Sequence, residues 1–286
     1  MGLKETILVT GAKGMIGSQL VKGLLADGYT VVGIDKSSDT SCSGQYFHHM
    51  CDLDDKDRLQ IIFDNYKIDR IIHLAALAHT KNEDDLSWER YYHVNVKCAK
   101  NIFELAGDRP VLFISTVDVF GFFNGGTVNP HTPLNPVTPY GKSKKMAEEE
   151  CRKLPHYTIF RFSPVYTPEI KRDIQKRYYL KYPKIAYQIG KGTEYEILNI
   201  DNAIASMVDW CSQETENDVR IIKDDKPMWT PDYIKAEKSE GRAKAVLKFP
   251  QWMVNCGYRV LKGITGENKY TYLLNKAVHP LKSEDI

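Results

Sequence analysis

Residues 6–17 read "TILVTGAKGMIG", a short β-branched run that passes directly into a loop with a glycine at every third position. Apolar residues then recur at helical spacing at Ile16, Leu20 and Leu24, so the loop is expected to open a helix. Glycines at such a turn let the backbone bend sharply and approach a phosphate, whose charge then lies at the helix N-terminus. The stretch predicts a dinucleotide-binding loop after the first strand of an α/β fold.

Short apolar runs alternate with helical patterns through the first part of the chain. The runs are apolar throughout, as expected for strands that are buried on both faces of a parallel sheet. Right-handed crossovers between such strands give a doubly wound parallel sheet, the Rossmann fold. The expected strands are residues 6–10, 29–35, 46–53, 68–76, 110–117 and 157–162, and the expected helices are residues 15–28, 55–66, 86–106 and 142–154.

The pattern loosens after residue 162, which predicts a smaller C-terminal substrate-binding domain. Open α/β sheets bind ligands beyond the carboxyl ends of their strands, so this domain is expected to lie there. Residues 1–165 are predicted to form the dinucleotide-binding domain and residues 166–286 mainly the substrate-binding domain. Residues near 195–225 contain a helical and a strand-like run and are expected to return to the main domain.

Composition excludes several classes of protein. The 286 residues carry a formal net charge of only +2, so no nucleic-acid partner and no membrane insertion is expected. The six cysteines form no CxxC or Cys/His cluster in the sequence, so neither a disulfide framework nor a metal site is expected. No apolar run approaches the ~20 residues that cross a bilayer, and no signal-peptide pattern is found. A cytoplasmic location is predicted.

A carboxylate ends the second expected strand, at Asp35. At this position it can accept hydrogen bonds from the adenosine ribose hydroxyls and repel a 2′-phosphate, which favours NAD over NADP. Lys36 follows directly and is a cation that could hold such a phosphate, so NADP stays open as the less favoured cofactor.

Several motifs occur in one order: "TGAKGMIG", "CDLDD", "HLAALAH", "FISTVDVFG" and "PYGKSK". Together they resemble the extended short-chain dehydrogenases/reductases, in particular the NAD-dependent epimerase/dehydratase family that acts on nucleotide sugars. The resemblance covers most of residues 5–210 and implies a nucleotide-sugar substrate and a homodimer. It implies cofactor contacts from Gly11, Gly14, Met15, Ile16, Gly17, Asp35, Lys36, Asp52, Leu53, Leu74, Ala75, Ala76, Asn95, Tyr140 and Lys144.

Tyr140 and Lys144 lie four residues apart and so share one face of an expected helix. A free tyrosine, with a pKa of ~10, is a poor base at neutral pH, but a neighbouring ammonium and a positive nicotinamide ring favour its phenolate. By resemblance, Thr116 bonds the reacting oxygen, with Ser115 as its substitute. Alternatively, Tyr140 packs and the lysine is surface charge; the upstream motifs favour catalysis.

The two residues that directly follow the expected catalytic threonine restrict which reaction the protein can catalyse. The 4,6-dehydratases of the resembled family carry an Asp-Glu pair there, whereas this chain has Val117 and Asp118. Valine cannot donate a proton, so elimination of water is not expected. Asp118 is either a further acid/base group or the cap of a turn. Substrate contacts are expected from Ser115, Thr116, Pro164 and Arg172.

The sequence therefore predicts a nucleotide-sugar epimerase that removes and returns a hydride at one sugar carbon, C4 by resemblance. A reductase of a nucleotide-linked 4-keto sugar would use the same residues, with Tyr140 as the acid. A non-catalytic dinucleotide sensor is the third alternative, although the chain keeps both Tyr140 and Lys144.

Overall fold

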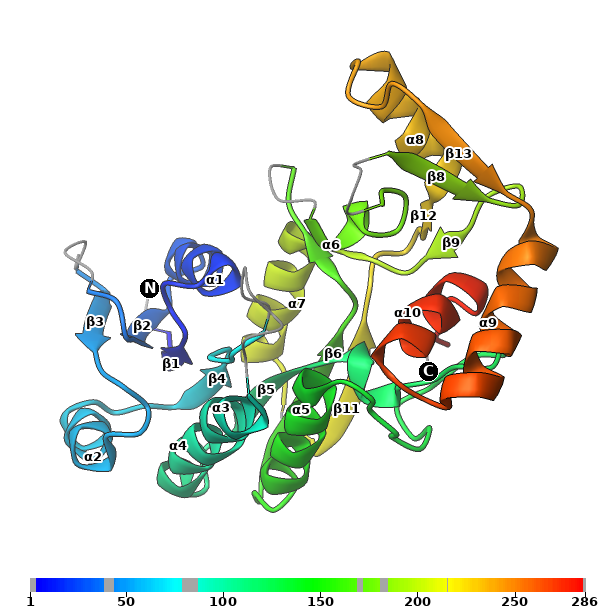
Figure 1. The fold of residues 1–286 in the computed structure, drawn as a ribbon. Coiled ribbons are helices and arrows are strands. Elements are labelled where there is room, and N and C mark those ends of the chain that lie inside the picture. The colour runs from blue at the N-terminus through cyan, green and yellow to red at the C-terminus, as the bar shows by residue number, and fades with distance from the viewer. Residues whose placement is uncertain are drawn as a thin grey trace. The chain divides into compact units, whose positions relative to one another are not determined.

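A computed structural model describes residues 4–38, 44–78, 87–168, 172–180, 185–214 and 216–284. The chain divides into two compact units (Figure 1). The first comprises Met1–Thr116, Pro139–Arg161 and Ala203–Arg220, and the second Val117–Thr138, Phe162–Asn202 and Ile221–Ile286. The sequence-based division at residue 165 placed residues 117–138 in the first unit, whereas in the structure they group with the second.

A seven-stranded sheet organises the first unit, in the order β11-β6-β5-β4-β1-β2-β3. Strand β1 pairs in parallel with β2 and β4, β2 with β3, and β4 with β5. Strands β2 and β3 are added on one side of β1, and β4 and the strands after it on the other side. The strand order therefore reverses between β1 and β4, the switch point at which such sheets bind ligands. The predicted Rossmann fold is thus confirmed. The strands are β1 (Thr6–Thr10), β2 (Thr30–Asp35), β3 (Tyr46–Met50), β4 (Arg70–His73), β5 (Val111–Thr116), β6 (Tyr157–Phe162) and β11 (Asp218–Ile222).

Helices cover both faces of this sheet (Figure 1). Helix α1 (Met15–Ala26) contacts β1 and β2, and its Gly23 faces Ile204 and Val208 of α7 (Ile200–Ser212). On the other face lie α2 (Lys56–Asn65), α4 (Cys98–Ala106) and α5 (Pro139–Cys151). Their apolar sides bury Leu59, Ile102 and Ala147 against the strands, because each helix repeats apolar residues at helical spacing.

The helix that precedes β5 is not regular. It was predicted as one helix over residues 86–106, and the structure resolves it into α3 (Trp88–Tyr92), a π-helical turn at His93–Lys97 and α4. The Cys98 backbone N–H donates to the His93 carbonyl, five residues back instead of four. One extra residue is thereby accommodated in the turn, which shifts the helical register of everything before it.

A buried ion pair joins α5 to the sheet. Arg161 on β6 donates to Glu148 on α5 through Nε at 3.1 Å and Nη2 at 2.8 Å, and each side chain is 1% exposed. The Ser115 hydroxyl donates to the same carboxylate at 2.6 Å. The network fixes the end of β5 directly before Thr116.

The second unit is built from short elements with their own apolar core around Tyr178, Tyr195 and Met228. Within the described residues of this unit, β7 pairs with β10, β9 with β12 and β8 with β13 in two-stranded sheets. The elements are a 3-10 helix at Val117–Phe120, β7 (Val165–Tyr166), α6 (Arg172–Gln175), β8 (Ala186–Ile189), β9 (Glu194–Tyr195), β10 (Leu198–Asn199), β12 (Met228–Trp229), α8 (Thr230–Ser239), β13 (Val246–Phe249), α9 (Gln251–Thr265) and α10 (Lys269–Val278). Over the described residues, no helix combines the length and apolarity needed to cross a bilayer.

Glu148→Ala is expected to destabilise the first unit strongly, because it leaves the buried Arg161 guanidinium without its counter-ion. The expected loss is about 3–5 kcal/mol of unfolding free energy, measured by urea denaturation. Glu149→Ala is the matched control, since its side chain is 58% exposed and a loss within about 0.5 kcal/mol is expected. A Glu148→Ala protein as stable as the control would contradict the buried pair.

Candidate functional site

The loop after β1 is packed too closely for side chains at two of its glycines. A Cβ atom on Gly17 would lie 2.0 Å from the Gly11 carbonyl oxygen. One on Gly11, whose φ is +71°, would lie 2.9 Å from the Ala75 backbone nitrogen. Gly14 forms the N-cap of α1, so free backbone N–H groups of the first helical turn begin here. The loop therefore offers a bare backbone surface at a helix N-terminus, which suits a pyrophosphate.

Asp35 lies at the carboxyl end of β2, next to this loop. Its carboxylate accepts the Lys13 backbone N–H at 3.0 Å and the Ser37 N–H at 2.9 Å. Lys36, the cation that could have favoured NADP, instead pairs with Asp52 at 2.9 Å. The Asp35 carboxylate, expected to face the ribose, is thus held by backbone groups, and the Lys36 ammonium is partly neutralised by Asp52. Both observations fit a dinucleotide without a 2′-phosphate.

Asn95 links the segment after β4 to the start of α5. Its side chain, 1% exposed, accepts the Leu77 N–H at 2.7 Å and donates to the Leu77 carbonyl at 3.0 Å. The same amide donates to the Ser143 hydroxyl at 2.9 Å, and that hydroxyl donates to the Tyr140 carbonyl at 2.8 Å. Asn95 thus links the backbone at Leu77 to the Tyr140 carbonyl through one connected network. Ser143 was not predicted as a site residue, although its three-residue spacing from Tyr140 is the signal that could have indicated it.

Lys144 is a buried lysine on α5. It is 2% exposed, and its ammonium lies 4.0 Å from the centroid of the Phe113 ring. Burial lowers the pKa of Lys144 to about 7, while the nearby Glu148 acts in the opposite direction. The lysine is therefore not surface charge, and the structure removes that alternative.

His73 is stacked against Phe113, with ring centroids 5.8 Å apart, and is fully buried. Burial, and then the charge of Lys144, lower the pKa of His73 to about 3, so the ring is neutral. Its Nδ1 atom bonds the Thr10 hydroxyl at 2.9 Å, and that hydroxyl accepts the Ala75 N–H at 3.3 Å. His73 thus supports the segment that closes over Gly11.

Tyr140 and Thr116 both belong to the first unit. Tyr140 stands in the first turn of α5, partly buried, with its ring centroid 6.4 Å from that of Tyr91. Thr116 is the last residue of β5. Neighbouring strand residues point to opposite faces, and the Ser115 hydroxyl is already engaged with Glu148. Of the two hydroxyl residues, Thr116 is therefore the better candidate to meet a substrate oxygen.

Asp118 lies in the second unit, where α10 supplies its partners. Lys276 Nζ is 2.6 Å from the carboxylate, and the Tyr272 hydroxyl donates to it at 3.3 Å. Burial, and then the Asp118 charge, raise the pKa of Tyr272 above its ordinary range. Val117 is buried with Val119 in a separate apolar cluster. The contacts of Asp118 thus fit an anchor for α10, and Lys276, far away in the sequence, carried no signal of this pairing.

The expected substrate residues of the second unit are less well defined. The Pro164 carbonyl accepts the Leu198 N–H at 3.0 Å, which joins the residue before β7 to β10. The Arg172 side chain lies outside the described residues. Asp224 is among the residues that line a polar hollow in the same unit, and its carboxylate accepts bonds from Tyr166, Asn199 and Asn202.

The chain was compared with models of known protein families. Residues 7–211 match the model of the NAD dependent epimerase/dehydratase family. The chain belongs to this family.

Individual relatives share either sequence or fold. A UDP-glucose 4-epimerase of Cyamopsis tetragonoloba is 32% identical over 166 residues, which are 52% of this chain and 47% of the relative. The UDP-glucuronic acid 4-epimerase of Bacillus cereus, solved with UDP-glucuronic acid and NAD, is 26% identical, with a TM-score of 0.68 over 86% of this chain and 85% of that one. A dTDP-glucose 4,6-dehydratase of Bacillus anthracis, solved with NAD, shares the fold at 18% identity, with a TM-score of 0.68 over 96% and 95% of the two chains. The chain spans about half the length of the curated relatives that it matches.

Lys144→Met is expected to stabilise the protein at pH 7 by about 1–2 kcal/mol of unfolding free energy, because it removes a buried ammonium. The unfolded lysine is charged below pH ~10.5, whereas the folded one is charged only below about 7. The destabilisation of the folded protein by Lys144 is therefore absent above pH ~10.5. It grows as the pH falls to about 7 and is constant below that pH.

Unfolding free energies of wild type and Lys144→Met, measured at pH 7 and pH 9, test this predicted dependence of stability on pH. The stability gain should be larger at pH 7 than at pH 9. Lys142→Met, at an exposed position of the same helix, serves as the matched control and should show no such dependence. An equal gain at both pH values would show that Lys144 is not held near neutrality by burial.

Proposed function

We propose that this protein is an NAD-dependent epimerase that inverts C4 of a UDP-linked hexose. One observation carries the proposal: a lysine with a pKa of about 7 lies one helical turn from Tyr140, in the same unit as a glycine loop bare enough for a pyrophosphate. The UDP-sugar 4-epimerases among its relatives support the choice of reaction and of nucleotide.

The residues present fit NAD. The loop over Gly11–Gly17 would hold the pyrophosphate, Asp35 the adenosine ribose, Asp52 and Leu53 the adenine, and Lys144 the nicotinamide ribose. Bound NAD would supply the acceptor and later the donor of a hydride. The close approach of Gly11 to Ala75 and of Gly17 to Gly11 supports this, because a side chain at either glycine would strike the neighbouring backbone and displace the loop.

Tyr140 is the proposed base and acid. Its phenolate oxygen would take the proton of the C4 hydroxyl as the hydride leaves, hold it while the keto-sugar turns, and return it to the new hydroxyl. The Lys144 ammonium favours the phenolate electrostatically, and the Thr116 hydroxyl would donate to the same sugar oxygen. Asn95 and Ser143 act as positioning residues, since their network reaches the Tyr140 backbone.

Elimination of water is not part of the proposal. A dehydratase needs a proton donor and a base directly after the catalytic threonine. Val117 is apolar and buried, and the Asp118 carboxylate is paired with Lys276. Both features support a reaction in which Tyr140 alone exchanges a proton with the sugar. The homodimer that the resemblance implies and the cytoplasmic location that the composition indicates both stay predictions.

A panel of UDP-, dTDP- and GDP-sugars and their 4-keto derivatives tests the proposal, incubated with protein and either NAD or NADH. A new isomer of unchanged mass, without net use of NADH, supports it. A keto-sugar that gains two hydrogens while NADH is consumed would replace it with a reductase, and loss of water with a dehydratase. NAD binding without turnover of any sugar would favour a dinucleotide sensor.

Tyr140→Phe is expected to lower kcat by about 10²–10⁴-fold, because phenylalanine has no group to exchange a proton. NAD affinity, measured by calorimetry, should stay within a few-fold of wild type. Tyr92→Phe, a partly buried tyrosine outside the proposed site, is the control and should keep its turnover. Near-normal turnover of Tyr140→Phe would remove the assignment.

A further inference from the structure

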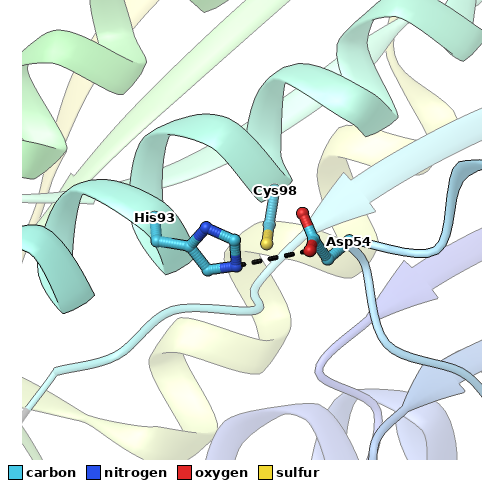
Figure 2. Close-up of side chains that lie close together, drawn as sticks. All are labelled: Asp54, His93 and Cys98. Atoms are coloured by element: carbon cyan, nitrogen blue, oxygen red, sulfur yellow. Dashed lines mark ion pairs between the residues drawn. The ribbon is translucent and has the colours of Figure 1, made fainter.

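Three potential metal ligands meet beside the adenine end of the expected cofactor site, and none of them has a role in the reaction above. Figure 2 shows the side chains of Asp54, His93 and Cys98 pointing toward one another. Their ligand atoms all lie within 4.8 Å of one another. The His93 Nε2 and Asp54 Oδ2 atoms are 3.6 Å apart.

The π-helical turn brings two of the three residues, His93 and Cys98, together. In a regular α-helix at ~100° per residue, side chains five positions apart point about 140° away from each other. The bond from the Cys98 N–H to the His93 carbonyl widens the turn, so that these residues approach one face of the helix. Such turns are rare in proteins, and those that occur often lie at functional sites.

The loop after β3 supplies the third ligand. The Asp54 backbone N–H donates to Asp52 Oδ1 at 3.2 Å, and Asp55 caps α2 by accepting the Arg58 N–H at 3.0 Å. These two bonds shape the turn that carries Asp54 toward the helix. The Asp54 and His93 side chains are 56% and 45% exposed, whereas Cys98 is 2% exposed. The thiol thus forms the floor of the cluster, and the other two ligands form its solvent-facing rim.

We propose that Asp54, His93 and Cys98 bind one zinc-class divalent cation, with water in the fourth position. One thiolate, one imidazole and one carboxylate form a donor set that zinc accepts. At metal–ligand distances of ~2.0–2.3 Å, tetrahedral neighbours lie roughly 3.3–3.7 Å apart. The observed His93–Asp54 separation already meets this, and rotation of the two exposed side chains closes the remaining distance to Cys98.

The thiol must lose its proton when the metal binds. Burial, and then the nearby Asp54 and Asp52 charges, raise the pKa of Cys98 to about 11, so the metal-free thiol is protonated at neutral pH. Binding therefore forms the metal–sulfur bond and releases that proton to solvent, without any redox change. The cation would tie the β3–α2 loop to the helix and so stabilise the folded unit.

The sequence alone predicts no metal site, because Asp54 lies far from His93 along the chain and no Cys/His motif spacing is present. The simpler reading of the cluster is a solvent-exposed Asp54–His93 ion pair above a buried thiol. The two readings differ in one measurable property, the coordination of a metal by sulfur.

Purified, metal-stripped protein titrated with zinc and separately with cobalt(II) tests the proposal. We expect one zinc per chain and a cobalt complex with thiolate-to-metal charge-transfer absorption. Free zinc at 100-fold above Kd should raise Tm by roughly 5–10 °C. Cys98→Ser should abolish the charge-transfer band. We expect a loss of zinc affinity of more than roughly 100-fold for each of His93→Gln and Asp54→Asn, whose side chains are exposed. That loss exceeds the effect of removing a residue that only contacts a metal ligand.

Cys256→Ser is the matched control, because this cysteine is exposed on α9 and should leave zinc binding unchanged. Circular dichroism of each variant verifies that it is folded. The proposal is overturned if cobalt gives no sulfur band in the wild type, or if folded His93→Gln and Asp54→Asn proteins bind zinc as tightly as wild type. Because every readout is metal binding, its failure is separate from any failure of the proposed epimerase activity.

Discussion

The burial of Lys144 against Phe113 is the constraint on which the proposed chemistry depends. An ammonium in this position is costly, and it stands on a helix that the Glu148–Arg161 pair holds to the sheet. That cost lowers the pKa of Lys144 to about 7 and so places a titratable cation one turn from Tyr140. The buried ammonium lowers the unfolding free energy of the protein. Such a cost is typical of functional sites, where proteins keep locally unfavourable groups.

Much of this arrangement was predictable from the sequence, because it rests on local patterns. Apolar runs and helical spacing predicted the parallel sheet, and the glycine spacing predicted the loop at β1, where a Cβ on Gly17 would strike the Gly11 carbonyl. The four-residue spacing of Tyr140 and Lys144 predicted their shared face on α5. The burial of Lys144 was not predictable, since it depends on packing against Phe113 of strand β5.

Contacts between residues far apart in the chain could not be predicted from the sequence. Asp118 was left open between an acid/base group and a turn cap, and its pairing with Lys276 joins two segments that share no motif. The π-helical turn at His93–Lys97 is a one-residue departure within an otherwise regular helical pattern. That turn brings Asn95 to Leu77 and Ser143, and it also brings His93 toward Cys98, so one backbone irregularity serves both the proposed active site and the proposed metal site.

The fate of the hydrogen on C4 tests the central claim most directly. Protein with NAD would be incubated with a UDP-hexose that carries deuterium at C4, and the products would be separated and analysed by mass spectrometry and NMR. Removal and return of a hydride, with Tyr140 exchanging only the hydroxyl proton, predicts a C4 epimer that keeps its deuterium and its mass. An epimer whose C4 deuterium has been exchanged for solvent hydrogen would contradict the claim.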